Sequence, residues 1–255
     1  MKILTMKFGG TSVGDVDRIK TVRDIISDEV KNGWNVVAVV SAMSNETNKL
    51  INLAKQVGIE SLVDPEYDSL ISTGEDISSS LLSIALNSIG ISSRSWRGWQ
   101  LPVITDSFHS NAKIEEIKTE KLIEMFKQGT KVAVVSGFQG IEKSGRLTTL
   151  GRGGSDTSAV AIAAAIDAKR CDIYTDVSGI FTTDPRIKRN ASKLKKISFE
   201  EMLEMASLGA NVLQTRAVEL AMRHKVPITV LNSFSKEEGT LVCDEEEIME
   251  KNIVS

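Results

Sequence analysis

The stretch ILTMKFGGTS, residues 3–12, decides the fold of this chain. Residues 3–8 form an apolar run of the length expected for a buried strand, and Gly9 and Gly10 follow it directly. Beyond the glycines, apolar residues recur at the spacing of one helix face, namely at Ile19, Val22, Ile25, Ile26 and Val30. The succession of strand, glycine turn and helix predicts the first unit of an α/β domain.

Continuous apolar runs recur at residues 36–40 (VVAVV) and 132–135 (VAVV), and each is followed by a serine. Runs without alternation are typical of parallel strands that are covered on both faces. The other predicted elements are strands at 172–175 and 228–231 and helices at 158–166 and 199–207, the last with Ser198 as N-cap. Alternating strands and helices predict an α/β fold, a three-layer αβα sandwich around a mainly parallel sheet, with ligands at the carboxyl ends of the strands.

Composition narrows the class of partner. The chain has 255 residues, 41% of them hydrophobic, which is enough for a large core in one α/β domain or two lobes. The formal charge is −3 and the basic residues are scattered, so we expect no nucleic acid and no membrane partner. The two cysteines, Cys171 and Cys243, exclude a disulfide framework and fit a reducing, cytoplasmic location. A small-molecule partner is the better expectation.

The turn after the first strand has the features of an anion site. Lys7 stands near the end of the strand, and Gly9 and Gly10 let backbone N–H groups approach an anion at the start of a helix. A purely steric need for glycine at a strand-to-helix turn explains the motif equally well. The Walker A spacing is absent, so a P-loop is excluded.

Three further segments carry polar groups at turns. GRGGSD at residues 151–156 combines a glycine-rich backbone with Arg152 and Asp156, and a flexible hairpin is the weaker alternative because an Ala-rich helix follows. Taken alone, Glu75 is better explained as an acid in the first turn of a helix than as a binding residue. The loop at 174–186 (YTDVSGIFTTDPR) offers acids, an aromatic ring and an arginine to a nucleoside, although as a pattern it is only a turn.

Taken in order, these motifs resemble the aspartokinase family within the amino acid kinase superfamily. The resemblance extends to about residue 242 and rests on KFGGTS (7–12), VVSAM (39–43), STGE (72–75), LGRGGSD (150–156) and YTDVSGIFTTDPR (174–186). Superfamily kinases for carbamate, acetylglutamate, glutamate or UMP share the fold without this combined set. The resemblance implies phosphorylation of the side-chain carboxylate of L-aspartate by ATP, the first step of lysine, threonine and methionine biosynthesis. Mg²⁺ is expected to arrive with ATP, without a metal site of the protein's own.

The resemblance also implies a role for individual residues. Lys7 and Asp156 correspond to the catalytic pair, in which Lys7 steadies the transferred phosphoryl group and Asp156 organises Lys7 and the substrate. Glu75 would hold the α-ammonium group of aspartate and Arg152 its α-carboxylate. The rest of the implied amino acid pocket is Ser41, Thr47 and Ser155, and the implied ATP site is Lys7, Gly9, Gly10, Thr175, Asp176, Phe181, Arg186 and Asn211.

The resemblance sets the expected domain organisation. Residues 1–243 would form the catalytic domain, with an N-terminal amino acid-binding lobe and a C-terminal nucleotide-binding lobe, and residues 244–255 a tail or truncated linker. No regulatory ACT domains are expected in this chain. The missing ACT region is explained by a truncated chain, by an enzyme that is naturally unregulated, or by regulation through a separate ACT subunit. By analogy with the superfamily alone, we expect a homodimer.

Two alternatives to an aspartate kinase stay open at the level of sequence. The first is another amino acid or carboxylate kinase of the same superfamily. The second is a nucleotide-binding subunit of weak catalytic power. It is supported by Asn211, where many relatives place a lysine that approaches the nucleotide phosphates. Asparagine keeps a hydrogen-bond donor at this position but loses the positive charge.

Overall fold

The computed structural model describes residues 1–188, 190–210 and 212–249. Within these residues the main sheet has the order β10 (Lys196–Ser198), β12 (Thr240–Cys243), β11 (Ile228–Asn232), β9 (Cys171–Thr175), β1 (Ile3–Phe8), β2 (Asn35–Val40), β6 (Val132–Ser136), β3 (Ser93–Trp96). Neighbouring strands pair in parallel, except that β11 and β12 are antiparallel. The predicted mainly parallel sheet is confirmed.

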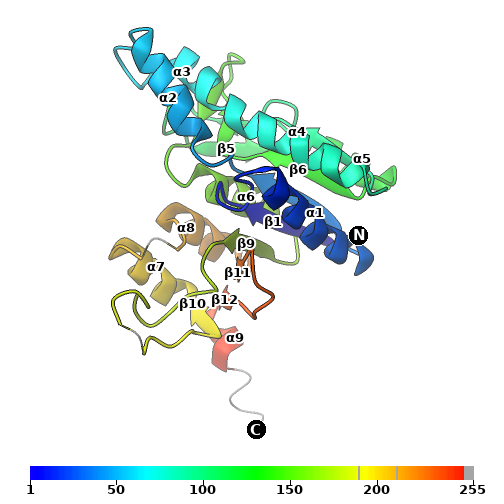
Figure 1. Cartoon of the computed structure of the whole chain (residues 1–255), viewed down its shortest axis with the longest axis vertical. Helices are drawn as coiled ribbons and strands as arrows, with labels where there is room; N and C mark the ends of the chain where they lie inside the picture. Colours follow the sequence, from blue (N-terminus) through cyan, green and yellow to red (C-terminus); the bar gives the residue numbers. More distant parts are fainter. Residues whose placement is uncertain (189, 211, 250–255) are drawn as a thin grey trace.

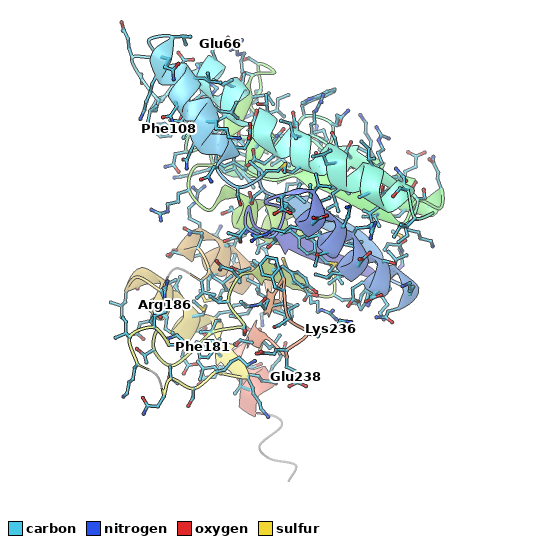
Figure 2. The ribbon with its side chains drawn as sticks, viewed as in Figure 1. Glu66, Phe108, Phe181, Arg186, Lys236 and Glu238 are labelled. Atoms are coloured by element: carbon cyan, nitrogen blue, oxygen red, sulfur yellow. The ribbon has the colours of Figure 1, made fainter. Side chains whose placement is uncertain are left out.

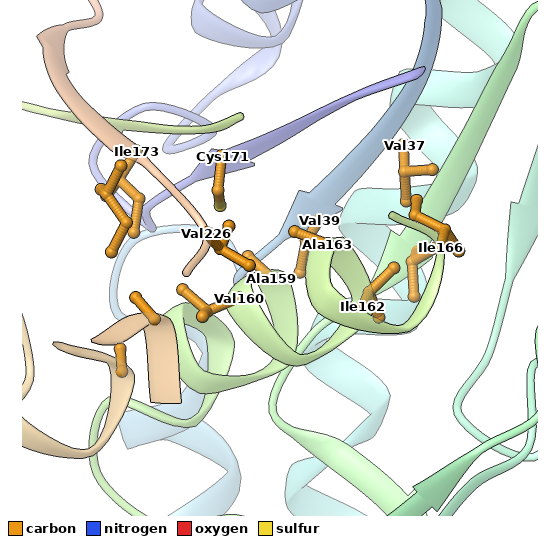
Figure 3. Close-up of a cluster of buried hydrophobic side chains, with 14 of the residues drawn as sticks. Val37, Val39, Ala159, Val160, Ile162, Ala163, Ile166, Cys171, Ile173 and Val226 are labelled. Carbon is orange, nitrogen blue, oxygen red and sulfur yellow. The ribbon is translucent and has the colours of Figure 1, made fainter. Parts of the chain in front are cut away.

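Helices cover both faces of this sheet (Figure 1). One face carries α1 (Val16–Lys31) and α4 (Thr73–Asn87), and the other carries α5 (Glu120–Lys127), α6 (Gly154–Ala165), α7 (Phe199–Ser207) and α8 (Thr215–His224). Alternate residues of β2 divide between the two cores. Val37 and Val39 pack on the α6 side (Figure 3), whereas Val36 and Val40 pack on the α1 side. Because both faces are buried, the run at residues 36–40 is apolar throughout.

The carboxyl ends of β1, β2 and β9 meet at one edge of the sheet. Phe8, the last residue of β1, is level with Val40 of β2 and with Tyr174 of β9. The turns that leave these three strands therefore lie next to one another, as expected for parallel strands. The predicted ligand-binding edge of the sheet is thus formed by residues that are far apart in the sequence.

The α6 helix starts earlier than predicted from the sequence. We expected its first residue near Ser158, but the helix begins at Gly154. Gly153 precedes it as N-cap with φ +71°, a left-handed conformation that glycine adopts without steric cost. Ser155 and Asp156 therefore belong to the first helical turn, which fixes their side chains more firmly than a loop would.

A smaller sheet, not predicted from the sequence, stands beside the main one. Its order is β5 (Ile114–Ile117), β4 (Val103–Thr105), β7 (Gln139–Ile141) and β8 (Leu147–Thr149). Next to β8 lies α3 (Pro65–Ile71), which packs against α2 (Glu46–Gln56). The strands of this sheet are only three or four residues long, so no alternation of polar and apolar residues marks them.

The two ends of the molecule are formed by different parts of the chain. Figure 1 shows α2 and α3 at one end and α7 with α9 (Glu245–Met249) at the other. The α9 helix falls within the segment predicted to be a tail, and the Lys196 ammonium donates to its Glu247 carbonyl oxygen at 3.1 Å. Among the described residues no helix combines the length and apolar character needed to span a bilayer.

Candidate functional site

A cavity of about 730 Å³ opens at the carboxyl ends of β1 and β2, beside the start of α6. It brings together eight of the residues singled out from the sequence: Lys7, Gly10, Ser41, Thr47, Glu75, Arg152, Ser155 and Asp156. These residues come from four separate segments of the chain. The convergence of Lys7 and Asp156 on one cleft, on which the sequence interpretation depended, is therefore present in the structure.

Lys7 and Asp156 form an ion pair in the wall of the cavity. The distance from Lys7 Nζ to Asp156 Oδ1 is 2.6 Å, and the two side chains are 12% and 10% exposed. Lys7 stands on β1 and Asp156 in the first turn of α6, which packs directly across β1. A lysine ammonium held by a carboxylate in a fixed helical turn is a positioned positive charge that faces the cavity. Such a charge suits a phosphoryl group.

Glycines around the cavity serve close packing as well as any ligand. A Cβ atom on Gly10 would lie 2.9 Å from the Ala42 carbonyl oxygen, which is too close for any other residue type. The N–H of Gly9 points to the Tyr174 carbonyl oxygen at 3.4 Å, and Gly9 is not among the residues that line the cavity. The steric explanation of the glycine turn is therefore valid alongside any role in binding.

Replacing Gly153 with alanine is expected to destabilise the protein by about 1–2 kcal/mol, because the residue is left-handed. In addition, its Cβ atom would lie 2.0 Å from Gln214 Cγ. Gly90→Ala is the matched control, since Gly90 has φ +81° and open space around it. Urea unfolding of both variants separates the conformational cost from the steric one. Equal losses of unfolding free energy would show that the packing against Gln214 contributes nothing.

Glu75 is a buried carboxylate with one unsatisfied oxygen. Its Oε1 accepts a hydrogen bond from the Ala42 N–H at 3.0 Å, whereas Oε2 has no hydrogen-bond partner among the described residues. Gly74 makes this approach possible, because a Cβ atom there would lie 2.8 Å from Ala42 Cβ. Burial raises the pKa of Glu75 from its ordinary value to about 8. A cationic ligand group would supply both the missing donor and the missing charge.

Arg152 lies at the rim of the cavity and is exposed. Among the described residues, its guanidinium makes no hydrogen bond and no ion pair, so its planar fork is open to a carboxylate. The cavity thus presents two cations, Lys7 and Arg152, and two carboxylates, Glu75 and the Asp156 that is paired with Lys7. That charge pattern fits a small amino acid with an acidic side chain, next to a phosphate.

Of the described residues implied for the nucleotide, only Lys7 and Gly10 line this cavity. Thr175 ends β9, one residue after the Tyr174 carbonyl that accepts from Gly9, and its hydroxyl donates to Asp176 at 3.2 Å. Phe181 forms a β-bridge with Lys193, and Arg186 is paired with Asp184 at 2.9 Å. Figure 2 shows Phe181 and Arg186 in the C-terminal half of the molecule. Asn211 lies outside the described residues.

Sequence reasoning missed several residues that line the cavity. Phe138 has φ +68° and Asn45 has φ +64°, and both are strained conformations for residues other than glycine. Gln214 precedes α8 and closes the cavity next to Gly153. The strand-end rule would have found Phe138, because β6 is parallel to β2 and ends two residues before it. No comparable signal marks Gln214.

Known proteins are similar to this chain in both sequence and fold. The aspartokinase of Rickettsia felis is 51% identical over 258 residues, which cover 100% of this chain and 64% of the relative. Aspartate kinase from Synechocystis superposes with a TM-score of 0.84 at 46% identity, over 95% of this chain and 40% of that one. Aspartokinase III of E. coli, solved in complex with aspartate and ADP, has a TM-score of 0.84 at 30% identity over 95% of this chain and 65% of its own.

This chain therefore spans less than two thirds of the length of the curated relatives it matches. The model of the amino acid kinase family matches residues 2–232, nearly the whole of the described chain. On this match, the chain belongs to the amino acid kinase family.

Proposed function

We propose that this chain transfers the γ-phosphoryl group of ATP to the side-chain carboxylate of L-aspartate, giving 4-phospho-L-aspartate. The observation that carries the proposal is the single cavity in which the Lys7–Asp156 pair lies together with Glu75 and Arg152. The relatives named aspartokinase, one of them solved with aspartate and ADP, support the same substrates. The reaction would be the first step in the synthesis of lysine, threonine and methionine.

The proposed chemistry needs positioning and charge neutralisation rather than a general base. A side-chain carboxylate is already ionised at neutral pH, so the nucleophile needs no proton acceptor. Negative charge spreads over the transferred phosphoryl oxygens in the transition state, where the fixed ammonium of Lys7 stabilises it. Asp156 holds that ammonium in place through the 2.6 Å ion pair. Its role is therefore to orient Lys7.

Mg²⁺ fits this arrangement as a companion of ATP. The described residues contain no cluster of three or more His, Cys, Asp or Glu side chains that could hold a metal by themselves. Mg²⁺ commonly takes one or two carboxylates together with substrate phosphates and water, and Asp156, which lines the cavity and is paired with Lys7, could supply one of them. When bound, the ion neutralises charge on the phosphate oxygens.

The amino acid would be held at both of its α-substituents. The unsatisfied Oε2 of Glu75 receives the α-ammonium group, and Arg152 receives the α-carboxylate. The hydroxyl groups of Ser41, Thr47 and Ser155 line the same cavity and complete the pocket. Thr175, Asp176, Phe181, Arg186 and Asn211, with Gly9 and Gly10, are proposed for the nucleotide on the basis of the family resemblance.

Aspartate binding is expected to tighten as the pH rises. Below its pKa of about 8, Glu75 is protonated in the empty site and offers no charge to an ammonium group. Above that pH it is ionised, so the KM for aspartate should fall about tenfold between about pH 7 and pH 9. Steady-state kinetics across this range measure the effect. Glu75→Gln should raise KM and remove the pH dependence, and a KM that rises with pH would contradict the assignment.

The proposed reaction itself is tested with a hydroxamate assay. Acyl phosphates react with hydroxylamine, so ATP, Mg²⁺ and L-aspartate should yield aspartyl hydroxamate with the wild-type protein. Turnover with glutamate and none with aspartate would establish the rival carboxylate kinase instead. ATP binding without turnover of either acid would establish the weak nucleotide-binding subunit.

Assembly and location are also part of the proposal. We expect a homodimer, and the exposed Ile77 and Ile84 on the outer face of α4 support an interface there. Residues 1–243 are proposed as the catalytic domain, for which a separate ACT subunit is one of the possible routes of regulation. The buried free thiols of Cys171 and Cys243 agree with the cytoplasm. Light scattering during size-exclusion chromatography checks the dimer, which Ile84→Lys should weaken.

A further inference from the structure

Asp68 is completely buried, yet the proposed chemistry does not use it. Its carboxylate accepts hydrogen bonds from the Ser110 N–H at 3.1 and 2.9 Å, the Ser110 hydroxyl at 3.1 Å, the Thr149 N–H at 2.9 Å and the Thr149 hydroxyl at 2.6 Å. His109 Nδ1 lies 2.9 Å from the same carboxylate. A buried carboxylate with this many donors is held in one position and holds its partners in turn.

The partners of Asp68 belong to two segments that are distant in sequence. His109 and Ser110 belong to the loop at 107–112, and Thr149 is the last residue of β8. Ser110 has φ +64°, which is an unfavourable conformation for serine. The hydrogen bonds from Ser110 to Asp68 offset that strain. Figure 2 shows Glu66, on the same helix as Asp68, and Phe108, in this loop, at the same end of the molecule.

The loop at 107–112 is the surface on which the Arg152 turn packs. A Cβ atom on Gly151 would lie 2.9 Å from both Asn111 Oδ1 and the Ser110 carbonyl oxygen. Arg216 bridges the loop at 107–112 and this turn, because its Nη1 donates to Asn111 Oδ1 at 2.9 Å and to the Leu150 carbonyl oxygen at 2.8 Å. These contacts therefore fix the backbone position from which the Arg152 side chain extends.

Through its backbone carbonyl, Asp68 is also connected to the start of the helix that carries Glu75. The Ser72 N–H donates to the Asp68 carbonyl oxygen at 3.1 Å, and α4 begins at the next residue, Thr73. Asp68 thus lies two helical turns before Glu75 and is hydrogen-bonded to the strand end that leads into Arg152. No other described carboxylate bonds both to the 107–112 loop and to β8.

From these contacts we propose that Asp68 is a positioning residue that sets the separation of the Glu75 carboxylate and the Arg152 guanidinium, and thereby the size of amino acid that the cavity accepts. The inference rests on the proposed function, in which these two groups hold the α-ammonium and α-carboxylate of aspartate. Asp68 is not among the residues that line the cavity. It acts through the loop at 107–112 and the turn at 150–153.

The test compares Asp68→Asn with Asp172→Asn. Asp172 is equally buried and is bonded to Arg170 Nε at 2.9 and 3.1 Å, but it does not line the cavity. In Asp68→Asn an amide NH₂ replaces one acceptor oxygen and faces the donors of Ser110 and Thr149. We expect the KM for aspartate to rise at least about tenfold, while the KM for ATP stays within about twofold.

Hydrogen–deuterium exchange supplies a readout that needs no substrate. In Asp68→Asn, peptides covering residues 107–112 and 147–154 should exchange faster, whereas Asp172→Asn should leave them unchanged at a similar loss of melting temperature. Equal KM shifts in the two variants, or unchanged exchange in Asp68→Asn, would overturn the inference. If Asp68→Asn does not fold, Thr149→Val removes one donor while keeping the side-chain shape, and a smaller change in the same direction is expected.

The two proposals fail separately. An inactive wild-type protein would refute the proposed function, and the exchange rates would still decide whether Asp68 couples the two segments. An active wild-type protein with an unaltered KM for aspartate in both Asp68→Asn and Thr149→Val would refute the positioning role alone.

Discussion

Lys7→Ala should lower the rate of phosphoryl transfer by a factor of about 10² to 10³, the usual loss when one donor to a transition-state oxyanion is removed. Lys7 supplies a full positive charge at the end of β1, and its 2.6 Å contact with Asp156 fixes that charge before the substrate arrives. The loss should appear in kcat, with a smaller change in the KM for aspartate, because the charge interacts with oxygens that become more negative in the transition state.

Two controls make the Lys7 result interpretable. Lys31→Ala removes a lysine that is also paired with an aspartate, Asp28 at 3.2 Å, but lies on the surface of α1 with 72% of its side chain exposed. Its rate should equal that of the wild type. Lys7→Ala leaves the Asp156 carboxylate without its partner, so thermal unfolding must confirm that the variant is folded at the assay temperature. A folded Lys7→Ala protein with a wild-type rate would remove Lys7 from the mechanism.

Arg152→Ala should raise the KM for aspartate about a hundredfold, while Arg152→Lys should recover only part of the loss. The guanidinium at the cavity rim can grip a carboxylate through two parallel hydrogen bonds, and a lysine ammonium lacks that fork. A hundredfold change in affinity corresponds to about 2.7 kcal/mol, within the range for a charged pair that loses one partner.

β-Alanine, which is aspartate without its α-carboxylate, removes the other partner of the proposed contact. Comparing aspartate with β-alanine in the wild-type protein and in the Arg152 variants therefore isolates the interaction between the guanidinium and the α-carboxylate. The wild-type protein should prefer aspartate strongly over β-alanine, and Arg152→Ala should abolish most of that preference. Succinate, which is aspartate without its α-ammonium group, tests the contact between that group and Glu75 in the same way. If Arg152→Ala keeps the wild-type preference for aspartate over β-alanine, the guanidinium does not bind the α-carboxylate.

The main sheet was predictable because its signals are local. The strand at Ile3–Phe8, the apolar run at 36–40 and the Ser198 cap of α7 each depend on a few consecutive residues, and the structure has all three. The smaller sheet was not predictable, because strands of three residues such as β4 and β8 are too short to carry a periodic pattern. Its pairing depends on tertiary contacts instead.

The site was predictable only where motif and strand end coincide. Lys7 and Asp156 each adjoin a glycine turn, and the packing of α6 on β1 brings the two side chains together. The role of Asp68 could not be predicted, because its hydrogen-bond partner Thr149 is 81 residues away in the sequence. No motif around either residue indicates that the two are in contact. Nothing in the sequence indicates that Phe181 and Arg186 lie away from the cavity, because their positions depend on tertiary contacts.

The single main sheet restricts how the two halves of the protein can move relative to each other. β1, β2 and β6 from the N-terminal half are hydrogen-bonded edge to edge with β9 and β11 from the C-terminal half. Swinging the halves apart as rigid bodies would break the ladder between β1 and β9, which runs directly beneath the cavity. Under the proposed function, we therefore expect substrates to enter by local movement of short segments that line the cavity, such as residues 43–45 and 151–153, while the main sheet keeps its shape.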